Sequence, residues 1–317
     1  MTSRRTQAAG GEAARGPQAE RSGGARLGLL MAAGACLLWG TVPACAKFVS
    51  LSGNVDALAA ALGRFAVAAV VLLGLTASRR QNVAAIPARE LQVLVLLGLT
   101  GVFGLGLFVF TGARLTTSIN LSVLLNANPI LICVLAAFVG ERITVGRTAG
   151  TVVGLVGCVV VIAQSQVRGR AELGSVAGDL CGVGAAASWA LYTVASRGLV
   201  RRYGPRQVTT WAIVLGTLML AAAALLIGVR MRPSLWEALA IVYLGAFPTA
   251  GGFLMWAEGL QRLDASVVGP LQYIAPVVSA VLGPLLFREP LTGWFLVGAL
   301  LTALGIHLAT PRAVAAS

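Results

Sequence analysis

The sequence predicts an all-α membrane protein in which ten transmembrane helices form two inverted five-helix repeats. Hydrophobic residues make up 57% of the chain and charged residues only 11%, with a mean hydropathy of +0.86; soluble domains carry about a quarter charged residues. The chain contains ten apolar runs near the length at which a helix crosses a bilayer. Its two halves also carry similar motifs in the same order.

The internal repeat is clearest in the last stretch of each half. Residues 114–118 (RLTTS) precede an apolar run that is broken by one proline and followed by 141–144 (ERIT). Residues 262–266 (RLDAS) begin 148 positions later and precede a similar run, followed by 289–292 (EPLT). Such repeats indicate a duplicated bundle, a usual architecture for transporters that hold substrate between two halves. Because five is an odd number, the second half must insert upside down relative to the first.

Helices are the expected structure of the ten runs, because the strands of a membrane barrel would be only about ten residues long and would alternate in polarity. A lipid-exposed segment must also satisfy its backbone hydrogen bonds internally. The runs span residues 27–46, 57–77, 91–110, 117–139, 148–164, 177–195, 208–228, 236–256, 266–287 and 293–309.

The segments outside the runs complete the predicted organisation. Residues 1–26 are rich in Gly, Ala, Arg and Gln and contain little to bury, so we expect a disordered cytoplasmic tail. We expect the first five-helix repeat to occupy residues 27–166 and the second to occupy 176–310.

Small residues and prolines inside the runs indicate close packing. Gly146, Gly150 and Gly154 share one face of the fifth run. Their spacing indicates a closely packed neighbouring helix, or it only reflects the composition of a chain with 39 glycines. Pro129 and Pro276 interrupt the fourth and ninth runs, and a proline opens the helical hydrogen-bond ladder. In a membrane this is tolerated only against protein or a wet cavity.

The net charge of +13 would suggest nucleic acid in a soluble protein, but here the basic residues are explained by membrane orientation. With the N-terminus inside the cell, sixteen of the 24 basic residues fall on the cytoplasmic side and seven on the outer side. The bias predicts an inner-membrane, multi-pass protein with both termini in the cytoplasm. The expected partners are the lipid bilayer and a small-molecule substrate, with no nucleic acid, and a homodimer is left open.

Few residues could support catalysis. All eleven acidic residues lie in the tail, in loops or at the ends of the runs, and His307 is the only histidine. The five cysteines have no metal-ligand spacing. Catalysis within lipid would need a nucleophile–base pair, paired carboxylates or a metal site. The sequence therefore predicts neither an enzyme nor a cofactor or metal.

Short motifs follow one another in a fixed order from about residue 27 to residue 310. They are Trp39-Gly40 with Lys47, Arg64-Phe65, Pro129 with residues 140–144 (GERIT), residues 178–180 (GDL), residues 188–193 (SWALYT), and Pro276 with residues 288–292 (REPLT). In these motifs the chain resembles the EamA-type, ten-helix members of the drug/metabolite transporter superfamily. The resemblance implies a transporter, places substrate between helices 1, 3, 4, 6, 8 and 9, and favours export.

Several polar and aromatic side chains share helix faces that should point into the bundle, because polar groups facing lipid cost about 1–3 kcal/mol or more each. Trp39 and Trp189 occupy equivalent places in the two repeats. Taken singly, these residues have a structural alternative, as interhelical hydrogen bonds or interface-belt residues. The predicted substrate-binding residues are Trp39, Lys47, Arg64, Asn120, Asn126, Asn128, Ser188, Trp189, Tyr192, Gln272 and Tyr273. The predicted gating or structural residues are Pro43, Pro129, Glu141, Pro276 and Glu289.

The charged candidates indicate the substrate class. Lys47 and Arg64 could pair with a substrate carboxylate or reach the outer headgroups. With the tryptophans, they favour export of a small organic metabolite such as an amino acid by alternating access. A cationic-drug carrier is the alternative, and the lack of a mid-membrane carboxylate argues against it. A non-transporting scaffold or sensor is a second alternative. Glu141 and Glu289, near helix starts, are expected to be helix caps or gate latches.

Overall fold

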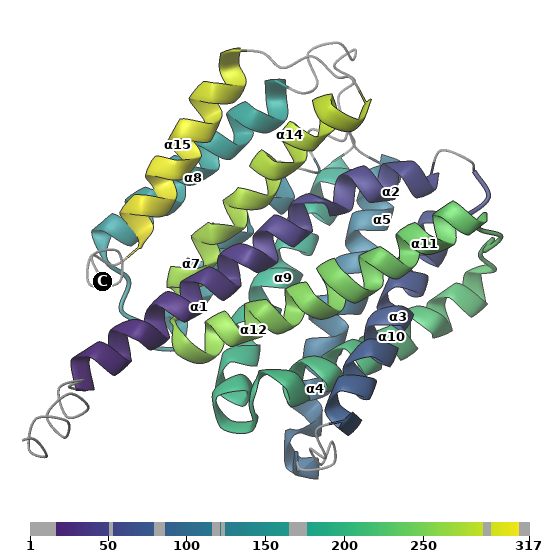
Figure 1. Ribbon diagram of the computed structural model, residues 1–317, viewed down its shortest axis with the longest axis horizontal. Coiled ribbons are helices and arrows are strands. Elements are labelled where there is room, and N and C mark those ends of the chain that lie inside the picture. The colour runs from purple at the N-terminus through teal and green to yellow at the C-terminus, as the bar shows by residue number, and fades with distance from the viewer. Residues whose placement is uncertain are drawn as a thin grey trace, which may run out of the picture.

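The computed structural model describes residues 17–50, 53–78, 86–115, 121, 124–164, 176–287 and 293–310. In these ranges the secondary structure is helical, apart from one isolated β-bridge between Val55 and Met231. Figure 1 shows the helices packed against one another, with the start of α1 and the end of α15 on the same side of the molecule. We refer to this side as the terminal face and to the other as the opposite face.

The helices of the two repeats follow the same order. The first repeat contains α1 (Pro17–Gly40), α2 (Val42–Ser50), α3 (Ala57–Ser78), η2 (Ala88–Glu90), α4 (Leu91–Gly98), η3 (Leu99–Gly104), α5 (Leu105–Leu115), α7 (Asn128–Phe138) and α8 (Val145–Gln164). The second contains α9 (Val176–Tyr203), α10 (Pro205–Ile227), α11 (Leu235–Leu244), η4 (Gly245–Gly251), α12 (Gly252–Arg262), α13 (Ala265–Val268), η5 (Gly269–Tyr273), α14 (Ile274–Phe287) and α15 (Gly293–Ala309).

Ten spans can be followed in the described part of the chain, which confirms the predicted fold class. The 28-residue α9 is one of them. Three shorter apolar helices are Asn128–Phe138, Val145–Val160 and Gly293–Ala309. Six stretches are long and apolar enough to cross a membrane, by length and composition: Gly23–Ala46, Ala57–Ser78, Ala88–Val109, Pro205–Ile227, Leu235–Arg262 and Ala265–Leu282.

Two helices are longer than the apolar runs predict. The first begins at Pro17, so residues 17–26, expected to be disordered, are helical, while residues 1–16 lie outside the described part. Proline suits a first helical position, because its missing N–H is unpaired there in any case. The sixth run was expected to end at residue 195, but α9 continues to Tyr203. The extension carries arginines that pair with acidic residues at the terminal face.

Helices 3 and 8 each contain a π-helical segment, which the apolar runs did not predict. These segments, η3 and η4, occupy corresponding places in the two repeats. Pro248 lies inside η4 and cannot donate a backbone hydrogen bond. A π-helical turn widens the helix locally and often marks a functional site. In η4, the carbonyl oxygen of Pro248 accepts a hydrogen bond from the indole nitrogen of Trp39, at 2.9 Å.

Helices pack across the repeats as well as within them. Helix α1 lies along α12 and α14, and the corresponding helix α9 lies along α5 and α7. Figure 1 shows two further pairs, α3 with α10 and α8 with α15. We define the first bundle as α4–η3–α5, α7 and α9, and the second bundle as α1, α11–η4–α12 and α13–η5–α14. Each bundle thus combines helices from both halves of the sequence.

Glycines hold α8 and α15 in close contact, which supports close packing over a composition bias. A Cβ atom added at Gly150 would lie 2.4 Å from the backbone nitrogen of Ala309 and 2.5 Å from the carbonyl oxygen of Gly305. A Cβ added at Gly154 would lie 2.6 Å from the ring of Tyr273. Gly146, one turn away, has more room, with its nearest neighbouring atom at 3.4 Å.

Replacing Gly150 with Ala is therefore expected to destabilise the protein by about 1–3 kcal/mol, the usual cost of overpacking a tight core. The same change at Gly146 is the matched control, because it adds one methyl group to the same helix without a clash. Thermal unfolding in detergent would measure both variants. Equal melting temperatures for the two would contradict a tight α8–α15 contact.

Candidate functional site

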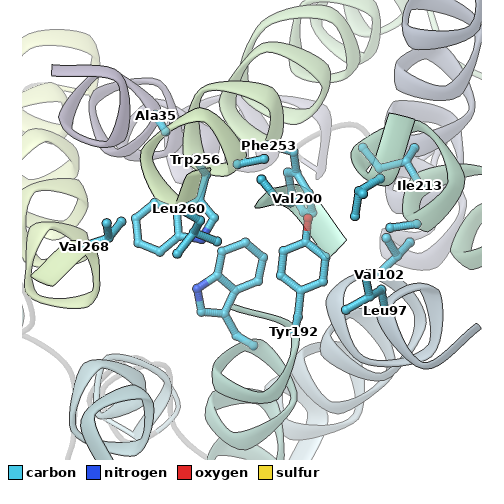
Figure 2. Close-up of a cluster of buried hydrophobic side chains, with 14 of the residues drawn as sticks. Ala35, Leu97, Val102, Tyr192, Val200, Ile213, Phe253, Trp256, Leu260 and Val268 are labelled. Carbon is cyan, nitrogen blue, oxygen red and sulfur yellow. The ribbon is translucent and has the colours of Figure 1, made fainter. Parts of the chain in front are cut away.

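Six buried or half-buried aromatic side chains from four helices form one contiguous group, which we call the aromatic cluster. Phe253 is its centre, with ring centroids 6.0 Å from Trp39, 5.4 Å from Trp189, 5.7 Å from Tyr192 and 6.1 Å from Phe65. Figure 2 shows Tyr192, Phe253 and Trp256 among the surrounding aliphatic side chains. The members are Trp39 of α1, Phe65 of α3, Trp189 and Tyr192 of α9, and Phe253 and Trp256 of α12.

The aromatic cluster lies where the two bundles meet. Trp39 of the second bundle and Trp189 of the first are in edge-to-face contact, with centroids 5.2 Å apart. Trp256 lies 5.3 Å from Trp39 and 6.1 Å from Trp189. Edge-to-face and offset arrangements at these distances are the favourable ones for aromatic pairs. The predicted equivalence of Trp39 and Trp189 thus places both rings at one central contact.

Glycines in and beside the π-helical segments make room for the cluster. A Cβ atom at Gly101 of η3 would lie 2.4 Å from the ring of Tyr192. A Cβ at Gly252, directly after η4, would lie 2.6 Å from the indole nitrogen of Trp39. Any larger side chain at these two positions would displace the rings, so the segments and the aromatic cluster form one unit.

The three indole N–H groups of the cluster are used differently. Trp39 donates to the carbonyl of Pro248. The indole nitrogens of Trp189 and Trp256 are buried, and neither has a hydrogen-bond partner within the described residues. A buried donor left unpaired costs about 1–3 kcal/mol. These two N–H groups could therefore donate hydrogen bonds to an acceptor oxygen of a bound molecule.

Arg64 borders the cluster through Phe65. Its guanidinium carbon lies 4.6 Å from the centre of the Phe65 ring, an arrangement that favours cation–π attraction. The Nε atom is buried without a hydrogen-bond partner. In the described ranges no carboxylate lies within ion-pair distance of Arg64. Arg64 is half-buried, and a cation inside a membrane protein that has no counter-charge among the described residues marks a functional candidate.

Among the described residues, no predicted residue of helices 4 and 9 is in ring contact with the aromatic cluster. Asn128 donates to the carbonyl of Leu125 at 2.9 Å, although its side-chain oxygen is buried without a partner in the described part. Tyr273 packs on Gly154 of α8. Gln272 is buried, and its side-chain nitrogen lacks a described partner.

The remaining predicted polar residues are placed as follows. Ser188 is half-buried on α9 next to Trp189, and its hydroxyl would lie 3.3 Å from a Cβ added at Gly104. Asn126 is half-buried in the turn before α7 and takes part in a polar interaction. Asn120 and the side chain of Lys47 lie outside the described part of the chain.

The predicted gating residues have different surroundings. Pro129 is the second residue of α7, and Pro276 is the third residue of α14, which continues directly from η5. Pro43 is exposed on α2, and Glu289 lies outside the described residues. Glu141 accepts backbone N–H groups from the first turn of α13. It therefore caps a helix of the other repeat, and not the helix that follows it.

Sequence reasoning did not select Phe253 and Trp256 as site residues. Their spacing of three places both side chains on one face of α12. That spacing was the available signal, but an aromatic pair on an apolar helix is equally typical of core packing. Ring contacts with Trp39 and Trp189 make both residues members of the aromatic cluster.

Comparisons with known proteins agree on a transporter. The chain is 30% identical over 253 residues to the aromatic amino acid exporter YddG of Ancylobacter novellus, covering 78% of this chain and 84% of that protein. It is 27% identical over 235 residues to a probable amino-acid metabolite efflux pump of Salmonella typhimurium, covering 70% and 77%. It also superposes on a crystal structure with a TM-score of 0.78 at 26% identity, covering 89% of this chain and 97% of that one.

The model of the EamA-like transporter family matches this sequence twice, over residues 26–163 and 176–310. The two matches correspond to the two sets of five helices, and together they cover most of the sequence. The resemblance found in the motifs is thereby confirmed. The chain belongs to the EamA-like transporter family, and it is a multi-pass membrane transporter rather than an enzyme.

Proposed function

We propose that the protein exports a small amino acid, or a closely related metabolite that carries a carboxylate, from the cytoplasm by alternating access. The observation that carries the proposal is the aromatic cluster between the two bundles. Among the described residues, two of its indole donors have no hydrogen-bond partner, and Arg64 beside it has no carboxylate partner. A substrate with a carboxylate and an organic body fits this combination of donors, charge and apolar rings.

Each part of the cluster would contribute a different interaction. The guanidinium of Arg64 would neutralise the substrate carboxylate, as arginine does with its planar fork of donors. The N–H groups of Trp189 and Trp256 would donate to its oxygens. The faces of the rings would hold the organic body and attract the ammonium group through their π electrons. The relatives include an aromatic amino acid exporter, a probable amino-acid metabolite efflux pump and a probable terminal-alkyne amino-acid exporter, which support this substrate class.

Substrate entry would require the bundles to move. Trp256 is 0% exposed and Tyr192 is 1% exposed, so the rings fill the centre in this conformation. Separation of the first bundle from the second would part Trp189 and Tyr192 from Trp39, Phe253 and Trp256. Alternating separation at the two faces would then expose the same rings to each side of the membrane in turn.

The proposed orientation places the terminal face in the cytoplasm. Arginines gather on this face at the end of α9, where Arg201 and Arg202 are exposed. The excess of basic residues in loops on the cytoplasmic side is the strongest orientation signal in a multi-pass protein. Lys47 and Asn120 remain proposed substrate residues, and Glu289 remains a proposed gate residue. A homodimer also remains a prediction.

Export of cationic drugs is the second candidate, since aromatic rings also bind organic cations. A transported cation would also need a carboxylate as its counter-ion. Glu258 of α12 is the described candidate, but it forms an ion pair with Arg262 one turn away. A paired carboxylate at the end of a helix is less suited to serve as the counter-ion of a transported cation. The aromatic cluster alone therefore favours neither class, and Arg64 favours the carboxylate.

Ligand-induced thermal stabilisation of the purified protein would test the proposal. Amino acids that carry a free carboxylate are expected to raise the melting temperature, because a ligand that binds only the folded state adds about 2.7 kcal/mol at 100 times its dissociation constant. Amino acid amides, which keep the body and lose the carboxylate, are the matched control. Stabilisation by cationic drugs alone would contradict the proposal and support the second candidate.

A further inference from the structure

A buried charged group joins the two bundles at the terminal face. Glu141 follows α7, and its side chain is only 3% exposed. Its carboxylate accepts hydrogen bonds from the backbone N–H groups of Ala265 and Ser266, each at 3.0 Å, and from the Ser266 hydroxyl at 2.7 Å. Since Glu141 continues the first bundle and α13 belongs to the second, one side chain bonds both bundles.

Arg197 of α9 completes this group from the first bundle. Its guanidinium lies 2.9 Å from the Glu141 carboxylate and also forms an ion pair with Asp264 of the second bundle. Its Nε atom donates to the carbonyl of Leu263 at 3.3 Å. Arg147 of α8 donates to the Ser266 hydroxyl at 2.7 Å. We call Glu141, Arg197, Asp264 and Ser266, with the backbone that they bind, the latch.

The latch lies between the terminal face and the aromatic cluster. Arg197 is eight residues from Trp189 on the same helix, a rise of about 12 Å along the axis. Thr193, one turn deeper than Arg197, is fully buried. The bundles are therefore held together at the end of α9 nearest the terminal face, directly beyond the rings that we propose bind substrate.

We propose that the latch is the gate of the terminal face, and that it must open in each transport cycle. Opening would break charge-assisted hydrogen bonds, which are about twice as strong as neutral ones, so the closed state is favoured. Water that enters as the bundles part would hydrate Glu141 and Arg197 again. Loss of either charge is expected to shift the equilibrium toward the state open at this face. The inference rests on the proposed function only in assuming that the two bundles separate alternately at the two faces.

The test uses Thr193→Cys as a reporter in the full-length chain, in membrane vesicles of known orientation. A membrane-impermeant thiol reagent would be added from the side that carries the termini, identified by protease removal of a terminal tag. Adding Arg197→Gln or Glu141→Gln is expected to raise the labelling rate of the reporter about tenfold or more, from the loss of bonds to a charged group. Labelling from the other side is expected to stay equal or fall.

Arg202→Gln is the matched control. Arg202 lies five residues further along α9, is 64% exposed and pairs with Glu90 at the surface, so it should leave labelling unchanged. The parent chain without the reporter gives the background of the five native cysteines. Ser266→Ala, a milder change that removes one hydroxyl, is expected to give an intermediate rate, and it keeps the test decisive if a charge variant does not fold.

Two results would overturn the gate. One is unchanged labelling in the Arg197, Glu141 and Ser266 variants. The other is an equal rise from both sides of the membrane, since that indicates general loosening and not a directional opening. The labelling requires no substrate, so an error in the proposed substrate would appear in the stabilisation experiment and leave this result intact.

Discussion

Replacing Arg64 with Gln is expected to lower transport of carboxylate-bearing amino acids by about 100-fold or more. The guanidinium lies against Phe65, beside the aromatic cluster, and has no carboxylate partner in the described chain. If the substrate supplies the counter-charge, the variant would leave that carboxylate buried without a partner, which costs about 3–5 kcal/mol. Counterflow of a radiolabelled amino acid in proteoliposomes would measure the loss.

The stability of the same variant separates a binding role from a structural one. Burying a charge without a partner is unfavourable, so a neutral side chain at position 64 should leave the melting temperature equal or raise it. Arg64→Lys should retain part of the transport, because it keeps the charge but not the planar fork of donors. Arg230→Gln, at an exposed position, is the matched control. A fall in melting temperature with unchanged transport would show that Arg64 only supports the fold.

Composition, apolar runs and the repeat were sufficient to predict the fold class, because lipid imposes length and hydropathy on every span. The equivalence of Trp39 and Trp189, 150 residues apart, also followed from the repeat. The structure adds that the two rings are in contact, with centroids 5.2 Å apart, since inverted repeats place equivalent helix faces on either side of one axis.

The sequence could not predict the features that depend on which helices are neighbours. The π-helical segments have no periodic signature, and they are stabilised by contacts such as that of Trp39 with Pro248, 209 residues away. The backbone N–H group of Ala265 that Glu141 accepts lies 124 residues away, in the other repeat, so local capping rules could not identify the helix that Glu141 caps. Membership of the two bundles is likewise set by side-chain packing, which apolar runs do not encode.

Replacing Trp39 and Trp189 one at a time would separate a role of each indole group in stability from a role in substrate binding. Replacing either residue with Phe removes one indole N–H and about the same volume. The stability lost because the ring is smaller should therefore be comparable at the two positions. Only Trp39 loses an existing hydrogen bond, to Pro248. Trp39→Phe is therefore expected to be less stable than Trp189→Phe by about 1 kcal/mol, measured by thermal unfolding.

Substrate affinity should change in the opposite order. The N–H of Trp189 is buried without a partner in the described residues, and a bond from it to a carboxylate would contribute about 1.5–3 kcal/mol. Trp189→Phe should then weaken binding about tenfold or more, and Trp39→Phe should weaken it less. A cavity or a general disturbance of the cluster would move stability and affinity together in each variant. If Trp39→Phe loses more stability and Trp189→Phe loses more affinity, then one indole supports the π-helical segment and its equivalent in the other repeat binds substrate.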